Sequence, residues 1–195
     1  MPRKTFDMLL SSAGVILTIV LVVGGFLAFW GYSFATNEVE TQLRAQRIYF
    51  PDPGDEQFAN PEIGPYIEQY AGQQVVNGEQ ARAFADHYIA VHLQDVNNGK
   101  TYAETSAESR ANPEDEELAA AVQTLFRGET LRGLLLNAYA FWKLGALARI
   151  GAFVAWGLAA LMALFSILGF WHVRRVEPTK MVLAPSEGPR EEQLS

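Results

Sequence analysis

The sequence contains no cysteine and only three histidines among its 195 residues. The absence of cysteine excludes disulfide bonds, so the folded parts of the chain must be held together by packing. Glycine-rich phosphate-binding loops of the Walker or dinucleotide type are also missing, and no serine stands in a nucleophile-elbow motif. These absences leave few residues suited to catalysis, and they argue against an enzyme.

Charged residues are missing from two long stretches of the chain. Residues 8–37 and 150–171 contain no Asp, Glu, Lys, Arg or His, over 30 and 22 positions respectively. Each stretch exceeds the roughly 20 apolar residues needed to cross about 30 Å of hydrocarbon. Both stretches end in aromatic residues, which favour the membrane–water interface: Phe29, Trp30 and Tyr32 in the first, and Phe170 and Trp171 in the second.

The first stretch has an alternative interpretation as a secretory signal peptide. The N-terminus is basic, and residues 33–35 loosely resemble a small-residue cleavage site. The apolar segment of a signal peptide is, however, only about 7–15 residues long. We therefore expect an uncleaved transmembrane helix at 8–35.

Positive charges flank both predicted spans on the same side of the membrane. Arg3 and Lys4 precede the first span, and Arg174 and Arg175 follow the second. Because Lys and Arg are enriched in cytoplasmic flanks, both termini are predicted to be cytoplasmic. The segment between the spans, 36–149, has 17 acidic and nine basic residues and a net charge of −8, so nucleic acid is not an expected partner.

Helix-capping patterns predict that the segment 36–149 is mostly α-helical. Four capping residues mark expected helix starts, two of them followed by proline and the last by a run of acids. Gly72 and the Asn98-Gly99 pair are expected to end the first two helices. A short strand is conceivable only at 73–76. The expected starts are Asn60-Pro61, Asn77, Thr101 and Asn112-Pro113.

Residues 126–149 are too charged for the bilayer, yet they carry more apolar surface than an exposed helix. Proline is absent from 114–170, so a long helix, bent or broken near Gly128 or Gly145, could run from the outer domain into the second span. Its apolar side needs cover from the preceding helix, the lipid interface or another subunit. The predicted assembly surface comprises Leu134, Leu135, Tyr139, Phe141 and Trp142.

The only local cluster between the spans that combines histidines with carboxylates is Asp86, His87, His92 and Asp95. The two histidines are five residues apart, which places them about 140° apart around a helix and directs them at different neighbours. A packed histidine is the simpler interpretation of His92. The four residues are therefore weak metal candidates, and no cofactor is expected.

Small residues are frequent in both predicted spans and permit close helix approach, either within one chain or between chains. The residues predicted to pack the spans are Gly24, Gly25, Ala28 and Gly31 in the first, and Gly151, Ala155 and Ala159 in the second.

Four blocks of the sequence carry a resemblance to a known family: "PEIGPYIEQYAGQQV", "GEQARAFADHYIAVHL", "GKTYAE" and "QTLFRGETLRGLLLNAYAFW". Over roughly residues 48–172 the chain resembles a family of small, uncharacterised actinobacterial two-span membrane proteins, which often carry the label of aromatic ring-opening dioxygenase. That chemistry needs iron held by two histidines and a carboxylate, and His87 and His92 are badly spaced for it. The resemblance implies an actinobacterial plasma membrane and adds no catalytic residue.

The predicted fold class is an all-α membrane protein with two transmembrane helices flanking an extracytoplasmic α-helical domain. The expected parts are a cytoplasmic N-terminus, two spans, the domain and a disordered cytoplasmic tail. Their boundaries are 1–7, 8–35, 36–149, 150–171 and 172–195.

The predicted function is that of a non-catalytic two-pass plasma-membrane protein whose outer domain mediates assembly. The expected partners are the lipid bilayer and either the chain itself or another membrane protein complex of the cell envelope. An oligomeric pore is the alternative, although spans without ionisable residues are poorly suited to a water-filled path. A metal-dependent membrane enzyme is the least favoured function.

Overall fold

A computed structural model describes residues 2–175, which form helices and connecting turns without a β-strand. The chain divides into two compact units. Within the described residues, the span unit consists of residues 2–29 and 150–175, and the middle unit consists of Trp30–Arg149. The predicted cytoplasmic tail lies mostly outside the described residues, which end at Arg175.

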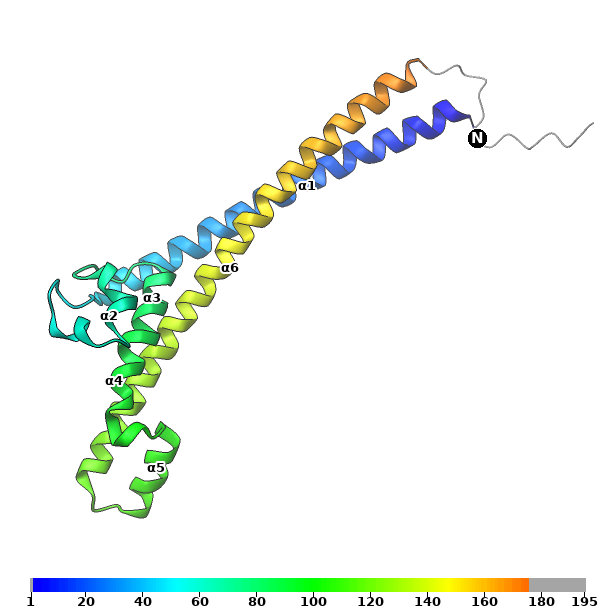
Figure 1. Cartoon of the computed structure of the whole chain (residues 1–195). Coiled ribbons are helices and arrows are strands. Elements are labelled where there is room, and N and C mark those ends of the chain that lie inside the picture. Colours follow the sequence, from blue (N-terminus) through cyan, green and yellow to red (C-terminus); the bar gives the residue numbers. More distant parts are fainter. Residues whose placement is uncertain (1, 176–195) are drawn as a thin grey trace, which may run out of the picture. The chain divides into compact units, whose positions relative to one another are not determined.

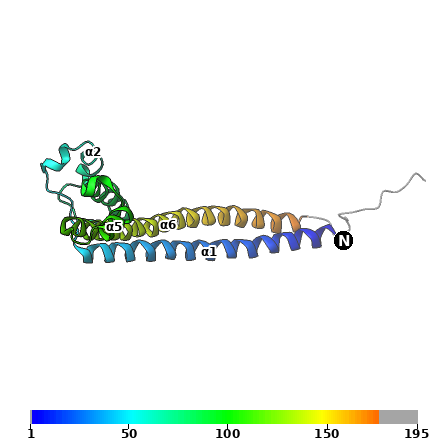
Figure 2. The same cartoon turned by 90° about the horizontal axis from the view of Figure 1, so that it is seen from below.

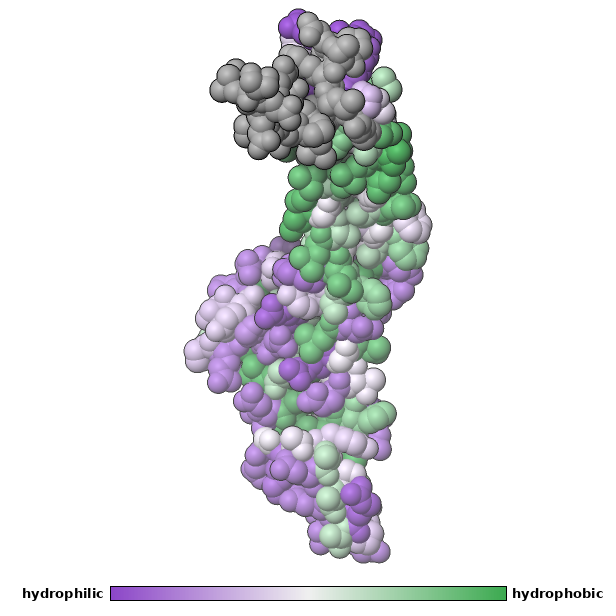
Figure 3. Space-filling view, turned by 90° about the vertical axis from the view of Figure 1, so that its right-hand side faces the viewer, coloured by the Kyte–Doolittle hydropathy of each residue, from purple (hydrophilic) through white to green (hydrophobic). Residues whose placement is uncertain are grey.

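Two long helices contribute to both units (Figure 1). Helix α1 runs over Arg3–Gln46, and helix α6 runs over Glu116–Val173. Each contains an 18-residue window apolar enough to cross a membrane, and only 11% of each window is buried within the protein. The face seen in Figure 3 accordingly shows a mostly hydrophobic span unit and a mixed, largely hydrophilic middle unit. The core helix of a soluble protein would be mostly buried, so this exposure favours contact with lipid.

Helix α6 confirms the long helix predicted to continue into the second span. It is 58 residues long and contains no break at Gly128 or Gly145. The two glycines instead permit close contacts: Gly128 lies against Leu93, and Gly145 lies against Ala35 and Thr36. A helix tolerates an internal glycine when neighbouring elements pack on it, because packing outweighs the cost of about 1 kcal/mol.

In the span unit α1 and α6 run side by side in opposite directions (Figures 1 and 2). Their contact is made by small residues on facing positions. A Cβ atom added to Gly14 would overlap the Ser166 hydroxyl, and one added to Gly169 would overlap the Ser11 hydroxyl. A Cβ atom on Gly25 would likewise overlap the indole of Trp156. The helix backbones therefore approach closely along a seam lined by glycine and serine.

The seam follows a seven-residue repeat on α6, where Ala152, Ala159, Ser166 and Val173 are all buried. A repeat of this length keeps one stripe of a helix facing its partner. An additional polar contact joins the two helices, because the indole Nε1 of Trp156 donates to the carbonyl oxygen of Val22 at 3.4 Å.

The seam corrects part of the predicted set of packing residues. Gly25 and Ala159 lie in it, and Ala28 and Ala155 are partly buried. A Cβ atom on Gly24, Gly31 or Gly151 would meet no atom within 4 Å, so these three glycines do not pack the two helices within one chain, and their packing between chains stays a prediction. Counting small residues does not reveal which of them fall on the repeat. The seam residues that the sequence prediction missed are Ser11, Gly14, Ala152, Ser166 and Gly169.

The middle unit joins the ends of α1 and α6 through short helices around one hydrophobic core. The core contains Val39 and Leu43 of α1, Leu135 of α6, and apolar residues of the segment between them. The short elements are η1 (Glu56–Ala59), α2 (Gly64–Ile67), η2 (Glu68–Tyr70), α3 (Gly78–Phe84), η3 (Ala85–Ile89), α4 (Ala90–Gln94), η4 (Val96–Gly99) and α5 (Tyr102–Ala111).

Two predicted helix starts are confirmed by their caps. The Asn77 side chain accepts the backbone N–H of Gln80 at 2.9 Å at the start of α3. Thr101 and Glu104 form the expected capping box at the start of α5. The Gln80 side chain reaches beyond the cap, because its oxygen accepts the backbone N–H of Val76 at 2.9 Å. This bond fixes the extended segment before α3.

The other two predicted starts are displaced by a few residues. Helix α2 begins at Gly64 rather than at Pro61, because the carbonyl of Asn60 first closes turns over residues 61–63. Helix α6 begins at Glu116 rather than after Asn112. Asn112 caps the C-terminus of α5, and the carboxylate of Asp115 accepts the backbone N–H of Leu118 at 2.9 Å near the start of α6.

The segment 73–76 is extended but forms no strand. It makes an isolated antiparallel bridge between Gln74 and Tyr49. The backbone N–H of Phe50 donates to Gln73 at 2.9 Å, and that of Val75 donates to Ile48 at 2.9 Å. Gly72 ends the preceding helical turn with a φ of +68°, as predicted, and residues 97–99 are also left-handed.

Two neighbouring glycines test the seam of the span unit. We expect Gly25→Leu to separate α1 from α6, because the new side chain would occupy the position of the Trp156 indole. Gly24→Leu is the matched control, since a side chain there points into open space. Thermal unfolding of each variant in detergent, followed by circular dichroism and Trp fluorescence, measures the difference. Equal melting temperatures of the two variants would contradict the seam.

Acidification tests the attachment of α5. Glu108 pairs with Lys100 at 2.6 Å and accepts a bond from Asn97, and these interactions lower the pKa of its carboxyl group. A lowered folded-state pKa adds stability above the unfolded-state pKa that is lost as the pH falls through the folded value. The protection factors of the α5 amides, which are corrected for the intrinsic pH dependence of hydrogen exchange, should therefore fall below the ordinary glutamate range. Glu108→Gln should reduce this pH dependence and leave the part that comes from Glu104, whose pKa is also lowered. Unchanged protection factors in the wild type down to pH 3 would refute it.

Candidate functional site

Within the middle unit, helix α6 packs against neighbouring elements on two sides. On one side α3, η3 and α4 run antiparallel to it (Figure 1). Gly78 at the start of α3 lies against Trp142, and Leu93 of α4 lies against Gly128. These two contacts fix both ends of the packed segment. On a second side Gly145 lies against α1.

A row of polar contacts follows the same interface between α3 and α6. Glu79 pairs with Lys143 at 3.5 Å, and Asp86 pairs with Arg132 at 3.3 Å. Between them the guanidinium of Arg82 donates to the Tyr139 hydroxyl at 3.0 Å. These groups are partly exposed, and such pairs contribute at most about 1 kcal/mol each. The row therefore sets the register of α3 on α6 more than it stabilises the unit.

The charge of Arg82 is favoured by the same contacts. The hydrogen bond to Tyr139 and the nearby Asp86 carboxylate raise the pKa of Arg82 above its ordinary value. The guanidinium also lies 5.0 Å from the centre of the Tyr139 ring. Tyr139 is thus half-buried beneath Arg82 and is committed to the interface with α3.

The predicted metal cluster falls on the π-helical segment η3 and on α4. The His87 ring stacks on Tyr66 of α2 with 3.7 Å between centroids, whereas the His92 ring contacts Tyr88 and its Nδ1 donates to the Tyr88 carbonyl oxygen at 2.7 Å. Asp86 faces Arg132. Within residues 2–175 no group of three or more His, Cys, Asp or Glu side chains is placed to hold a metal ion. The cluster, including Asp95, is therefore not assembled into a site.

The structure divides the predicted assembly surface between the inside and the outside of the unit. Leu135 is 1% exposed and belongs to the core, and Trp142 packs on Gly78. These two residues, together with Tyr139, are corrected to internal positions, because α3 covers their side of α6. Of the three expected covers, the preceding helix is the one found on this side, and its Phe84 and Tyr88 pack in the same core. Leu134 and Phe141 remain outward, 57% and 54% exposed.

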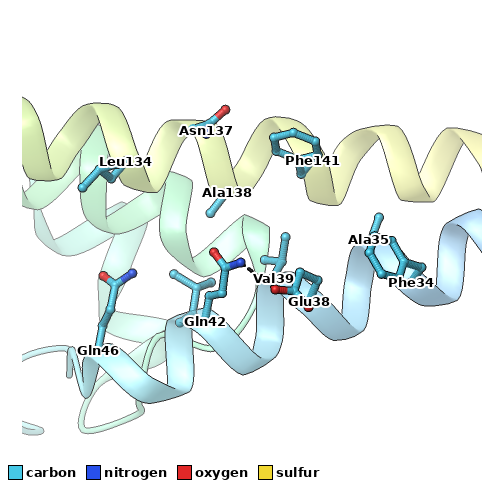
Figure 4. A pocket seen from close by; sticks show the side chains of 11 residues that line it. Phe34, Ala35, Glu38, Val39, Gln42, Gln46, Leu134, Asn137, Ala138 and Phe141 are labelled. Atoms are coloured by element: carbon cyan, nitrogen blue, oxygen red, sulfur yellow. Dashed lines mark hydrogen bonds between the residues drawn. The ribbon is translucent and has the colours of Figure 1, made fainter.

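The outward residues border a groove between α1 and α6, on the side away from α3 (Figure 4). The groove has a volume of about 430 Å³. Its floor is formed by small and apolar residues such as Ala35, Val39 and Ala138. Its rim, which we call the open face, consists of Phe34, Glu38, Gln42, Gln46, Leu134, Asn137 and Phe141.

The polar residues of the open face are mostly amides. Glu38 is the one charged residue among those lining the groove, and the Gln42 amide donates to its carboxylate at 2.7 Å (Figure 4). Phe34 is 59% exposed. Exposed aromatic side chains beside uncharged polar groups are typical of surfaces that bind other proteins.

Sequence reasoning missed the half of this face that lies on α1. The first span was predicted to end at residue 35, whereas α1 continues to Gln46. A signal was present, because neither glycine nor proline occurs between Gly31 and Pro51. A helix that meets no breaker at the end of a span can continue beyond it.

Comparisons of the chain with protein-family models, with curated proteins and with solved structures gave no match.

Proposed function

We propose that this chain is a two-pass membrane protein whose segment 36–149 is an assembly module on the outer side of a bacterial plasma membrane, and that it acts through the open face. The observation that carries the proposal is that the α1–α6 pair of the middle unit is covered by its own chain on one side only. The uncovered side presents Phe34, Leu134 and Phe141.

Burial of the open face by a partner would contribute considerable free energy for a small surface. A large aromatic or aliphatic side chain contributes about 1.5–3 kcal/mol when it is fully removed from water. Three such side chains stand more than half exposed at the open face. Side chains of this type serve as the anchors of protein interfaces when a partner excludes water from them.

The resemblance to actinobacterial two-span membrane proteins is consistent with this proposal and stays a prediction. It supplies the expected membrane and no chemistry. The non-catalytic character of the proposal rests on the side chains themselves, since Asp86, His87 and His92 are each engaged with a different neighbour.

The alternative of an oligomeric pore receives no support from the span unit. The hydroxyl groups available to line a path are those of Ser11, Ser12, Thr18 and Ser166. Ser11 and Ser166 face Gly169 and Gly14 inside the seam, and Thr18 donates within α1 to the Gly14 carbonyl at 2.8 Å. Hydroxyl groups engaged in the seam or by their own helix are poorly suited to a water-filled wall.

Topology is the first testable part of the proposal. Trypsin added outside spheroplasts should cleave after Arg47, which is exposed in the turn that follows α1, and should leave a tag at either terminus intact. The positive flanks of both spans are the physical reason. Fragment sizes on immunoblots check the outcome, with detergent-permeabilised cells as the control. Loss of the C-terminal tag in intact spheroplasts would refute the topology.

Two adjacent residues test the assembly role. Phe141→Ser should reduce association by about 2 kcal/mol or more while leaving the melting temperature of the dissociated chain unchanged, because the ring lies on the open face and outside the core. Trp142→Ala should instead remove about 3–5 kcal/mol of stability, because it empties a packed position against Gly78.

Native sizing and thermal unfolding on the same detergent samples measure both effects. Gly133→Ala serves as a control on α6, since an added Cβ there meets no atom within 4 Å. If Phe141→Ser left the size of the native complex unchanged, the open face would not be an assembly surface.

A further inference from the structure

We propose that the open face binds the open face of a second copy of this chain, so that two α1–α6 pairs form a four-helix bundle around a two-fold axis. This inference rests on the proposed membrane assembly function and names the partner. Three features of the open face support this pairing: its charge, its side-chain chemistry and the direction of its helices.

Charge opposes the approach of two open faces only weakly. The segment 36–149 carries a net charge of −8, so two copies repel one another in general. The groove between α1 and α6 is lined by a single charged residue, Glu38, and that carboxylate is hydrogen-bonded to Gln42. Two open faces therefore bring little of this negative charge together.

The polar groups of the face are complementary to themselves. Gln42, Gln46 and Asn137 carry amides, each of which both donates and accepts hydrogen bonds. Amides on one copy can thus satisfy amides on another without a different partner. An isologous interface requires this self-complementarity, because the same patch is used by both subunits.

The direction of the helices determines how two copies meet. With a two-fold axis along the α1–α6 pair of the middle unit, facing open faces place α1 of one copy beside α6 of the other. Since α1 and α6 run in opposite directions, every neighbouring pair in the resulting bundle is antiparallel, as in up-and-down four-helix bundles.

The register within one chain sets the height of each residue in this bundle. Gly145 lies against Ala35, so Ala138, seven residues earlier, stands level with Gln42, seven residues later. Asn137 and Gln42 of both copies therefore come to one level. The aromatic rings of Phe34 and Phe141 form apolar levels nearer the spans.

The area is sufficient for an interface between membrane-anchored proteins. Burying three half-exposed large side chains and the amides on each copy removes on the order of 1,000 Å² in total, at the low end for stable interfaces. Anchoring in one membrane raises the effective concentration of the copies, so a modest interface is enough.

Cysteine cross-linking tests the pairing, because the chain contains no cysteine of its own. Two differently tagged full-length chains are co-expressed, one with Glu38→Cys and the other with Leu144→Cys. Leu144 is 60% exposed and lies one turn from Phe141, near the level of Glu38 on the partner. Oxidation in membranes should produce a dimer that carries both tags.

The matched control replaces Leu144→Cys by Gln69→Cys, which is exposed on η2, on the side of α6 that α3 and α4 cover. We expect several-fold more mixed dimer with Leu144→Cys than with Gln69→Cys, and loss of that excess when Phe141→Ser is added. Equal yields of mixed dimer with both cysteines would mean that the cross-links arise from random collisions of the chains, and would overturn the pairing.

The failures of this inference and of the proposed function are distinguishable. If no mixed dimer formed but Phe141→Ser still reduced the size of the native complex, the partner would be another protein, and the second-copy inference would be wrong. If neither cross-linking nor native sizing responded to Phe141→Ser, both proposals would be wrong, and lipid would be the remaining cover of the groove.

Discussion

A helix that is apolar around most of its circumference needs cover on more than one side, and α6 is such a helix. In the middle unit α1 covers one side and α3 with α4 covers another. The arrangement of the short helices follows from this need, since their apolar residues meet Leu135 and Trp142 while their charged residues pair with Lys143 and Arg132. The open face is the part of the circumference that the chain leaves uncovered.

Helix starts and the long helices were predictable because they depend on local chemistry. Asn77 and Thr101 cap their helices as their sequence neighbours require, and the absence of proline from 114 to 170 allows α6 to continue unbroken. Glycine was harder to interpret. Gly128 and Gly145 were expected to bend or break the helix, but a glycine also permits close approach, and only the position of Leu93 and Ala35 distinguishes the two roles.

The candidate site was predictable only in part, because sidedness depends on tertiary register. Adjacent residues Phe141 and Trp142 have the same chemistry in the sequence, yet one is outward and the other packs on Gly78. The same limit applies to the seam of the span unit, where Gly25 is packed and Gly24 is not. Composition predicts that such residues pack somewhere, whereas the partner helix decides which of them do.

The π-helical segment Ala85–Ile89 lies between α3 and α4, and it gives them one residue more than the stretch of α6 on which they pack. Gly78 and Leu93 are 15 residues apart, and the residues that they contact on α6, Trp142 and Gly128, are 14 apart. A π-turn holds an extra residue without ending the helix, so it takes up the surplus between two fixed contacts. The segment thus resembles a single-residue insertion that was retained inside a helix, and it turns Asp86 toward Arg132 while His87 faces Tyr66.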